Sequence, residues 1–552
     1  MHTGNVILIT PAIALVVFAM VVLLLGVIAS KRPDKGLDHW FPTQYAAPAL
    51  TAAVLAFSGA VIWMSLRLVG KTEQAIINGA RTDVPAVGLF VTAGGHAQLT
   101  VDPFAAIISF AAIAGTLIVM LLSLHHFGEH QIHKAEYYSL LMLATAAASF
   151  AAASSDLIAI YLSIEFLSLT SYILAAFAKT DRRSAEAGLK YFLYGAACSA
   201  VMLYGMSILF GITGGSTSLS AIAAGFAHGK VALTGAGWVA IMFTLVGMGF
   251  KLALVPFHFW APDTYEGAPT PVTAFLSVVS KAAGLAVIIR FLTVVATPSD
   301  AGSLSWYWIL VVLTALSMLY GNLVAIWQRN IKRMLAYSSI AQVGYMMVGV
   351  LAAMHTFTRA GSAFGIPNAS VRAEVAGDSV PMDIQGVLIY VLAYLFMNLG
   401  AFAVVIAVGK RMKSDAIDSY AGLMKHAPFY AAALAVFLFS LAGVPPTAGF
   451  LGKLFVFGSA IKVGSPELVV LAILGVVNSV ISAYYYLNVV RLMFSAPCEQ
   501  DVKICGSTAV NAAIVVTLVM TLALTVFAKP VSELTAQAVY AHNPVHVISP
   551  GP

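Results

Sequence analysis

The sequence contains very few charged residues for its length. Only 9% of its 552 residues are Asp, Glu, Lys or Arg, whereas 60% are hydrophobic, and the mean hydropathy is +0.91. A soluble globular protein has about 25% charged residues. So few charges cannot cover a water-exposed surface. The composition therefore excludes a soluble globular fold and indicates that most of the surface faces lipid.

Cysteine is also scarce, with three residues in the chain. Cys198 lies in an apolar segment, and Cys498 and Cys505 share one loop without a CxxC spacing. The four histidines of a second loop, at positions 125, 126, 130 and 133, do not have a zinc-binding spacing either. These patterns argue against an iron–sulfur cluster or a bound metal. We therefore expect no cofactor and no redox centre within this chain.

Lys- or Arg-rich blocks are absent as well. The formal net charge of +6 comes from basic residues scattered over the loops between apolar runs. A nucleic-acid partner would call for clustered basic residues, so none is expected.

Long apolar runs make up most of the chain. They reach about 20 residues or more and do not alternate with a period of two, which favours membrane-spanning helices over barrel strands. The first run has no basic region before it and is too long for the core of a signal peptide, so we predict that it is a retained helix. The predicted fold is an all-α, polytopic membrane protein with about fourteen transmembrane helices. The predicted spans are approximately 5–30, 45–68, 103–124, 137–153, 157–178, 185–212, 232–255, 270–296, 304–327, 333–354, 384–408, 427–456, 466–490 and 508–528.

Loop charges predict the orientation of these spans. With fourteen helices, one set of loops holds sixteen Lys and Arg residues and the opposite side holds seven. By the positive-inside rule the sixteen lie inside, which places both termini outside. Two longer connections, 69–102 and 355–383, are polar and contain glycine, so we expect loops there and assign them no role.

Six basic residues fall within the predicted spans. Arg67 and Arg290 lie near helix ends, where their side chains are expected to snorkel to the membrane surface. The interior set is therefore one acid and four lysines: Glu165, Lys190, Lys251, Lys281 and Lys453. Each costs about 2.5–3.5 kcal/mol at the centre of a membrane helix. One Glu–Lys pair could simply hold two helices together, and Lys190 lies within two turns of a loop, but four lysines exceed what one such pair explains.

A buried lysine can carry protons. Desolvation lowers the pKa of a lysine, and a nearby carboxylate raises it again. A carboxylate that moves closer or farther therefore loads or unloads a proton. Lysines spaced through a membrane can form a switchable proton relay without a metal or prosthetic group.

Prolines break two of the predicted spans. Pro256 interrupts the seventh next to Lys251, and Pro445 and Pro446 interrupt the twelfth next to Lys453. Breaks of this kind are tolerated where the backbone lines a wet cavity. The broken spans are five apart and so cross the membrane in opposite directions, which is typical of inverted repeats around an ion path.

This pattern divides the chain into parts. We predict helices one to three in residues 1–136, a first repeat of helices four to eight in 137–296, a second inverted repeat of helices nine to thirteen in 304–490, and a final helix with a short tail in 508–552. His258 follows the first break, where both a structural hydrogen-bonded role and a proton-relay role fit a histidine. Asp263 and Glu266 lie on the next turn, where solvation explains them as well as a proton entrance does.

Three stretches closely resemble the antiporter-like proton-channel subunits of respiratory complex I, the proton-translocating NADH:quinone oxidoreductase. They are "GFKLALVPFHFWAPDTYEGAPTPVTAFLSVVSKAAG", "WQRNIKRMLAYSSIAQVGYMMVG" and "LAGVPPTAGFLGKLFVF". The resemblance extends from about Tyr137 to Arg491. Lysine in "GFLGKLF" and the short tail are most similar to subunit N of that family.

The resemblance implies a site and partners. By motif, Glu165 matches the fifth-helix glutamate, Lys251 its seventh-helix partner, Lys281 the central lysine and Lys453 the lysine on the exit side. Lys190 matches a sixth-helix lysine, and His258 matches the histidine of the "PFH" segment. NAD, FMN, iron–sulfur clusters and quinone are implied for partner subunits, together with other membrane-arm subunits. The implied location is the bacterial inner membrane, with both termini on the periplasmic side.

Other functions remain open from the residues alone. A cation/proton antiporter subunit, or the membrane arm of a related hydrogenase-type complex, would use the same lysines. A stand-alone transporter would need a polar substrate pocket, for which no residues stand out, and the excess of lysine argues against a purely structural scaffold.

Overall fold

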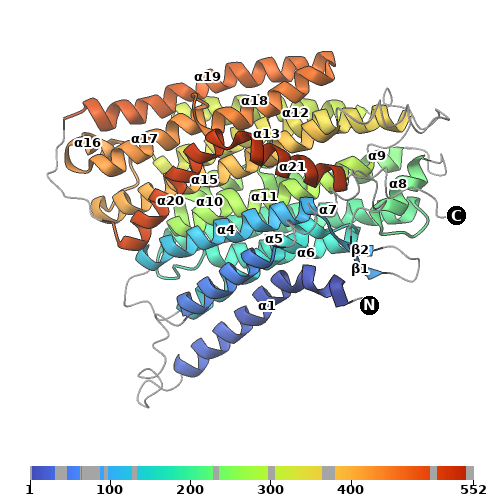
Figure 1. Cartoon of the computed structure of the whole chain (residues 1–552), viewed down its shortest axis with the longest axis horizontal. Helices are drawn as coiled ribbons and strands as arrows, with labels where there is room; N and C mark the ends of the chain where they lie inside the picture. The colour runs from blue at the N-terminus through green and yellow to red at the C-terminus, as the bar shows by residue number, and fades with distance from the viewer. Residues whose placement is uncertain are drawn as a thin grey trace.

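The computed structural model describes residues 3–30, 47–62, 64, 87–91, 97–126, 134–227, 235–295, 305–362, 380–497 and 506–542. Helices dominate these residues, and most of them run side by side along the long axis of the molecule (Figure 1). Within this described part, ten helices are long and apolar enough to cross a membrane. Shorter apolar helices accompany them at Thr10–Leu24, Ala47–Ile62 and Pro428–Ala442.

The described elements follow one another as helices with a single small sheet. They are α1 (Thr3–Ser30), the helix Ala47–Ile62, β1 (Val87–Val91), β2 (Ala97–Val101), α4 (Pro103–His126), α5 (Lys134–Ala153), α6 (Leu157–Ala175), α7 (Arg182–Ile212), α8 (Leu219–Ala227), α9 (Gly235–Leu252), α10 (Trp260–Gly267), α11 (Thr270–Val295), α12 (Ser305–Ile326), α13 (Ile331–Ser362), α15 (Val380–Met412), η3 (Ile417–Tyr420), α16 (Leu423–His426), α17 (Pro428–Ala442), α18 (Ala448–Val463), α19 (Pro466–Ser495), α20 (Thr508–Val526) and α21 (Ala528–His542). Each of the fourteen predicted spans coincides with one of these helices or with a broken pair, so the all-α polytopic fold is confirmed.

The predicted breaks are present in helices seven and twelve. The seventh helix ends at Leu252 and resumes as α10, and the twelfth ends at Ala442 and resumes as α18. Ala253 and Gly443 adopt the left-handed conformation at these ends, with φ of 58° and 90°. The next amide bonds five residues back in each case, Leu254 N to Gly249 O at 2.9 Å and Val444 N to Phe439 O at 3.0 Å. Both half-helices therefore end in a Schellman-type turn.

Part of the predicted loop 69–102 is instead a β-hairpin. Strands β1 and β2 pair antiparallel, with Val87 opposite Val101 and Leu89 opposite Leu99. Val, Leu, Phe and Thr favour strands, and these residue types are frequent in both segments. Residues 69–86 and 92–96 of that loop, and all of 363–379, lie outside the described residues. The predicted loop 355–383 is helical at both ends, because α13 continues to Ser362 and α15 begins at Val380.

Two helices were not predicted as separate elements. The connection after the sixth span contains α8, and the predicted tail contains α21, which packs against α4 and α15. Gln385 of α15 donates hydrogen bonds to the carbonyl and hydroxyl oxygens of Ser532, at 2.7 and 2.6 Å. Both helices are shorter than a membrane span, so a search for long apolar runs does not find them.

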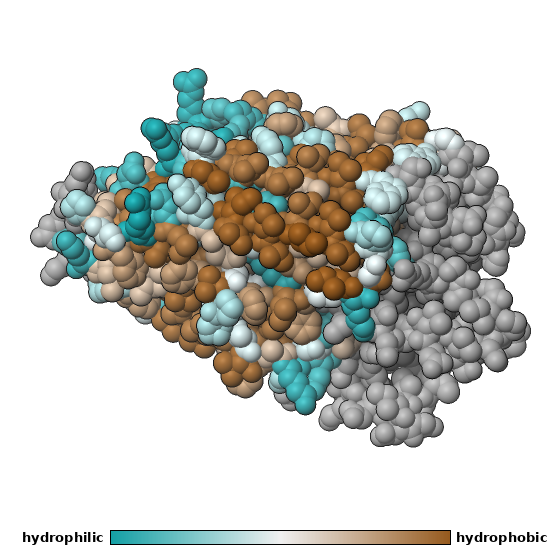
Figure 2. Space-filling view, turned by 90° about the horizontal axis from the view of Figure 1, so that it is seen from above, coloured by the Kyte–Doolittle hydropathy of each residue, from teal (hydrophilic) through white to brown (hydrophobic). Residues whose placement is uncertain are grey.

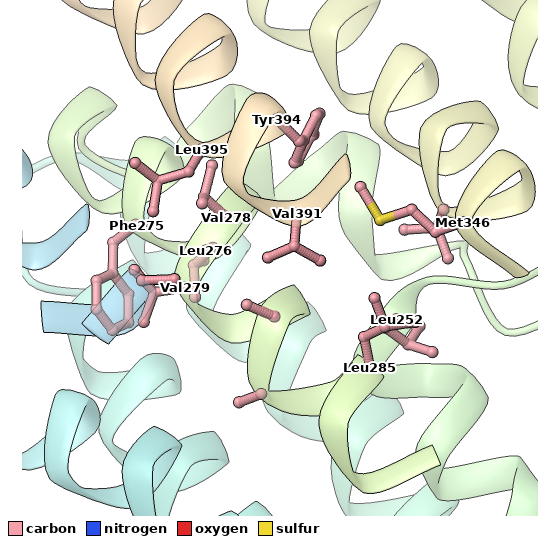
Figure 3. Packing of buried hydrophobic residues seen from close by; sticks show 14 of the residues in the cluster. Leu252, Phe275, Leu276, Val278, Val279, Leu285, Met346, Val391, Tyr394 and Leu395 are labelled. Carbon is pink, nitrogen blue, oxygen red and sulfur yellow. The ribbon is translucent and has the colours of Figure 1, made fainter. Parts of the chain in front are cut away.

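Three helices form the buried centre of the molecule. All residues of the apolar window of α11 are buried, as are 94% of those in α13 and α15, compared with 33% in α7 and α20. Figure 3 shows side chains of α9, α11, α13 and α15 meeting there, among them Leu252, Leu285 and Val391. The peripheral helices expose apolar side chains, and Figure 2 shows them covering the middle of one face, with hydrophilic residues toward its edges. This arrangement is what a lipid-facing protein requires.

Arg290 is buried, so the prediction that its side chain snorkels to the membrane surface is wrong. It is 4% exposed and forms an ion pair with Asp102, Nη2 to Oδ1, at 2.7 Å. Its Nε donates to the carbonyl oxygen of Ala152 at 2.6 Å, and its guanidinium lies 5.2 Å from the ring centroid of Phe104. Asp102 in turn accepts a hydrogen bond from the amide of Ala105 at the start of α4. The partner lies 188 positions away in the chain, so only the tertiary structure could supply it. Arg67 lies outside the described residues.

Candidate functional site

Four lysines are buried in the described part of the structure; Lys332 forms an ion pair with Asp415 at 3.2 Å, and the other three have no carboxylate in an ion pair. Lys251, Lys281 and Lys453 are 0%, 3% and 5% exposed, and they lie on α9, α11 and α18. The broken helices supply the first and the third, and the fully buried α11 supplies the second. A buried amine is costly unless it has polar partners, so the partners of each lysine define the chemistry of the site.

Lys251 contacts two hydroxyl groups. Its Nζ lies 3.1 Å from Oγ of Ser168 on α6 and 3.5 Å from the hydroxyl of Tyr191 on α7. The Tyr191 ring stacks on Trp260 at 4.2 Å between centroids, which fixes the phenol beside the amine. A Cβ placed on Gly284 of α11 would lie 3.2 Å from Cγ of Lys251. Gly284 therefore lets Lys251 lie close against α11, one turn from Lys281.

Glu165 lies near Lys251 without forming a direct ion pair. It accepts a short hydrogen bond from the hydroxyl of Ser199 on α7, and within the described residues no ion pair links it to a lysine. Glu165 and Ser168 are three residues apart on α6, so they lie on the same helix face. Glu165 has Ser199 as its hydrogen-bond partner and Lys251 has Ser168 and Tyr191, and no hydrogen bond or ion pair joins the acid to the base among the described residues.

Lys281 donates to a single side chain. Its Nζ lies 2.7 Å from Oγ of Ser339 on α13 and 5.9 Å from the centroid of the Tyr265 ring. The hydroxyl groups of Ser280, Tyr265 and Tyr394 are buried and have no hydrogen-bond partner among the described residues. Buried polar groups of this kind usually bind internal water. The surroundings of Lys281 therefore offer sites for water within the core.

Lys453 has carbonyl partners instead. Its Nζ donates to the backbone oxygens of Leu441 at 3.1 Å and Ala442 at 2.9 Å. Both carbonyls belong to the last turn of α17, where the helix dipole favours a positive charge. The amine also lies 4.8 Å from the centroid of the Tyr345 ring. A Cβ on Gly443 would lie 3.0 Å from Cδ of Lys453, so this glycine leaves room for the side chain as well as adopting the left-handed φ.

A polar stripe on α13 faces both Lys281 and Lys453. Ser339 accepts from Lys281, and Gln342, three residues later, donates from Nε2 to the carbonyl oxygen of Leu441 at 3.1 Å. Leu441 is also a partner of Lys453. The hydroxyl of Tyr390 donates to Oε1 of Gln342 in a short hydrogen bond. Two polar side chains one helical turn apart on α13 therefore contact the central lysine and the carbonyl that the third lysine shares, while no hydrogen bond joins Ser339 to Gln342 among the described residues.

The polar stripe on α13 was not predicted from the sequence, although the spacing of its residues is visible there. The segment "YSSIAQVGY" places Ser339, Gln342 and Tyr345 three residues apart, which puts them on one helix face. The first serine of the pair, Ser338, hydrogen-bonds to the hydroxyl of Tyr486 on α19. A search confined to charged residues does not find uncharged groups of this kind.

Lys190 lies apart from the other lysines, in the N-terminal half of α7. Its side chain is 41% exposed and forms ion pairs with Glu186 at 2.9 Å and Asp263 at 2.8 Å. The prediction that it belongs to the interior set is therefore wrong for its position. Its place within two turns of a loop let the long side chain reach the membrane surface.

Asp263 and Glu266 are paired rather than merely solvated. Nη1 of Arg333 lies 2.7 Å from Oδ1 of Asp263 and 2.9 Å from Oε2 of Glu266, so one guanidinium joins both acids of α10 to α13. Burial works to raise the pKa of Asp263, but hydrogen bonds from Lys190 and Arg333 outweigh burial and lower it. This network ties α7 and α10, in the first half of the chain, to α13 in the second.

A polar cavity opens beside this network. Its volume is about 790 Å³, and its lining includes Glu266, Thr270, Lys332 and Asp415. Lys332 and Asp415 form an ion pair at 3.2 Å across it. From Thr270 a line of hydroxyls runs along α11 at helical spacing, through Thr273, Ser277 and Ser280, to Lys281. The cavity and the central lysine therefore share one helix face.

His258 is buried in the break between α9 and α10. It is 2% exposed, and neither ring nitrogen has a hydrogen-bond partner among the described residues. Its ring lies 4.5 Å from that of Phe259 and 4.6 Å from that of Tyr320 on α12. These contacts do not include any of the three lysines of the candidate site.

Metal ligands do not gather in the described part of the chain, where no group of three or more His, Cys, Asp or Glu side chains could hold an ion. Of the four histidines noted in one loop, His130 and His133 lie outside the described residues. Cys198 is half-buried and free, whereas Cys498 and Cys505 lie outside the described residues.

Comparison with known proteins gives consistent matches. The family model described as NADH:quinone oxidoreductase/Mrp antiporter, TM, matches residues 154–365 and 377–482. NADH-quinone oxidoreductase subunit N of Desulfitobacterium hafniense is 39% identical over 440 residues, covering 79% of this chain and 84% of the relative. A chain of Thermus thermophilus respiratory complex I, solved with bound aureothin, is 30% identical, with a TM-score of 0.71 and coverage of 95% and 99%. A chain of the Mrp complex from Dietzia sp. DQ12-45-1b has a TM-score of 0.78, covers 99% of both chains and, at 20% identity, shares the fold.

Proposed function

This chain belongs to the transmembrane family of NADH:quinone oxidoreductases and Mrp antiporters, within its subunit N group, and from that premise we propose that it moves protons across the membrane along its buried lysines. The proton path consists of Lys251, Lys281 and Lys453, with Glu165 beside the first. Redox reactions in partner subunits drive the transfer. No step of this proposal needs a redox centre in this chain.

One observation supports the proposal above all others. Ser339 accepts a hydrogen bond from Lys281 at 2.7 Å, and one helical turn later Gln342 donates to the Leu441 carbonyl that Lys453 also contacts, each at 3.1 Å. Polar groups in a membrane core cost free energy, so their presence at both lysines favours a functional role. Unpartnered hydroxyls beside Lys281 give places for water to complete the path.

The partners of the lysines favour one direction of transfer. Hydroxyl groups, as at Lys251 and Lys281, can donate or accept a proton, so these amines can alternate between neutral and charged forms. Carbonyl oxygens can only accept, so the partners of Lys453 suit an ammonium group. A proton that leaves Lys251 or Lys281 is therefore stabilised when it reaches Lys453.

The entrance is proposed at the inner face. The polar cavity beside Thr270 opens there, and the α11 hydroxyls lead from it toward Lys281. Lys190 contributes by holding Asp263 at this entrance, and His258 flanks the first break as a second titratable group. The excess of basic loop residues supports an inner position for this end, with both termini on the periplasmic side of a bacterial inner membrane.

Partner subunits complete the enzyme in this proposal. Other membrane-arm subunits pack beside the chain, and NAD, FMN, iron–sulfur clusters and quinone belong to the partners. A change of charge near Glu165 would alter its distance from Lys251, and with it the proton affinity of that amine.

The decisive experiment removes one buried amine at a time. In inverted membrane vesicles that contain the whole complex, Lys281→Ala and Lys453→Ala should each lower NADH-driven proton uptake several-fold while the complex still assembles. Lys179→Ala, which removes an exposed lysine of an inner loop, should leave uptake unchanged and serves as the control. Normal uptake in both buried-lysine variants would rule out the lysine relay.

A cation/proton antiporter complex is the alternative, and the same vesicles can test it. A path lined by lysines repels metal cations, which favours protons. Uptake that required Na⁺, in a purified complex without flavin and iron–sulfur clusters, would support the antiporter instead.

A further inference from the structure

Two buried asparagines lie in the second half of the chain and are not explained by the proton path. Asn322 of α12 and Asn478 of α19 are both 0% exposed. The Nδ2 of Asn322 donates to the hydroxyl of Tyr345 at 2.8 Å and to Oδ1 of Asn478 at 3.2 Å. Its Oδ1 accepts from the hydroxyl of Tyr485 at 3.0 Å. Three helices, α12, α13 and α19, meet in this small network.

The network fixes the position of one aromatic ring. An amide in a membrane interior is costly unless its donors and acceptor are satisfied, so a fully bonded amide strongly prefers one arrangement. Because Asn322 is itself held by Asn478 and Tyr485, the hydroxyl of Tyr345 is held by a partner that cannot easily turn. The Tyr345 ring is also packed edge-on against Phe457, with centroids 5.8 Å apart.

The face of that ring is turned toward Lys453. The Nζ atom lies 4.8 Å from the ring centroid, within the range of a cation–π interaction. Phe457 is four residues after Lys453, so the same turn of α18 supplies both the amine and the ring packed against Tyr345. The contact is specific to the charged form, because a neutral amine gains little from the negative face of a ring.

We propose that Asn322, together with Asn478 and Tyr485, positions Tyr345 as an aromatic support that stabilises the ammonium form of Lys453. Asn322 is then a positioning residue, acting through the ring, and Tyr345 is the group that contacts the proton carrier. The inference rests on the proposed function, since it assigns a role in setting the proton affinity of the last lysine.

Other groups near Lys453 are few. From α13 and α15 the titratable groups are Tyr345 and Tyr390, and from α19 they are Tyr485 and Tyr486; the end of α17 presents only carbonyl oxygens. No carboxylate forms an ion pair with Lys453 within the described residues. The charge of a nearby acid therefore does not compete with the ring in the test below.

The test changes the electrostatics of the ring without changing its size much. Tyr345 is replaced by 3-fluorotyrosine, by 3,5-difluorotyrosine and by 2,3,5-trifluorotyrosine in the whole complex, which keeps the hydroxyl that Asn322 holds, and proton uptake is measured against pH. Fluorine withdraws charge from the ring face, so the pH of half-maximal uptake should fall stepwise along the series, by about one unit overall, which is a tenfold change in proton affinity. Identical pH profiles for the three variants would overturn the proposal.

A second variant tests the positioning network. Asn322→Leu releases the ring, so the effect of fluorination should become much smaller in that background. Asn488→Leu, an exposed asparagine on α19, is the matched control and should leave the series unchanged. If Asn322→Leu kept the full effect of fluorination, Asn322 would have no positioning role.

The two proposals fail in different ways. Loss of uptake in Lys453→Ala with a flat fluorination series removes only this inference. Normal uptake in Lys453→Ala removes the lysine relay and this inference together.

Discussion

Gln342 and Lys453 donate hydrogen bonds to the same atom, the carbonyl oxygen of Leu441, each at 3.1 Å. Leu441 lies in the last turn of a half-helix, where its carbonyl lacks the partner that a continued helix would supply. The break in the twelfth helix therefore creates an acceptor that an uninterrupted helix would not have. The break at the proline pair therefore leaves one carbonyl oxygen that Gln342 and Lys453 share.

Replacing Gln342 with Leu should interrupt transfer between the second and third lysines. We expect NADH-driven proton uptake to fall several-fold in vesicles, because Gln342 lies one helical turn after Ser339 and shares the Leu441 carbonyl with Lys453. Gln385→Leu, at the outer end of α15, is the matched control and should have little effect on uptake. Equal uptake in the two variants would show that Gln342 is not part of the path.

Gly284→Val should displace the first lysine. A Cβ at this position already lies 3.2 Å from Cγ of Lys251, and the two further methyl groups of valine have no room beside it. We expect proton uptake to fall well below that of Gly284→Ala, which adds only the Cβ. Gly458→Val, where a Cβ meets nothing within 4 Å, controls for valine in a helix. A Gly284→Val complex that assembles and pumps normally would contradict the close approach of α9 and α11.

Breaking the Asp102–Arg290 pair should destabilise the protein strongly. Arg290→Met leaves the Asp102 carboxylate buried without its partner, which typically costs about 3–5 kcal/mol. The double variant Asp102→Leu with Arg290→Met should recover most of that loss, because no buried charge is left unpaired. About 1 kcal/mol should remain lost, because Asp102→Leu also removes the hydrogen bond that caps α4. Thermal unfolding of the purified complex measures both effects. A double variant no more stable than Arg290→Met would show that the pair is favourable in its own right.

The inner network should make stability depend on pH through Asp263. Its pKa is lowered in the folded protein, so the carboxylate contributes stability above its unfolded pKa of about 3.9, and this contribution is lost as the pH falls through the lower folded value. Asp263→Asn should therefore melt at a lower temperature than the native complex at pH 7, and the difference should close on acidification below about pH 4. A difference that stays constant between pH 7 and pH 3 would refute this linkage.

Most of the fold could be predicted from the sequence. A membrane interior leaves backbone groups no partner except their own helix, so apolar runs of sufficient length must become helices, and every predicted span has one. The breaks in helices seven and twelve could also be predicted, because Pro256 and the pair Pro445 and Pro446 cannot donate the backbone hydrogen bond that continues a helix. It did not identify α8 or α21, whose lengths and compositions do not require a membrane span.

The candidate site was predicted only in part. Lys251, Lys281 and Lys453 could be singled out because a charge in hydrocarbon is costly wherever it lies. Sequence alone predicted that these amines are buried and that two of them lie beside helix breaks, but it also predicted an interior Lys190 and a surface Arg290, and the structure shows the opposite for both. Only the tertiary structure decided the partners: Ser168 and Tyr191 at Lys251, the carbonyl of Leu441 at Lys453, and Asp102 at Arg290. The reason is physical, since local composition shows where a charge is costly, whereas its exposure and its partners depend on how helices distant in the chain pack together.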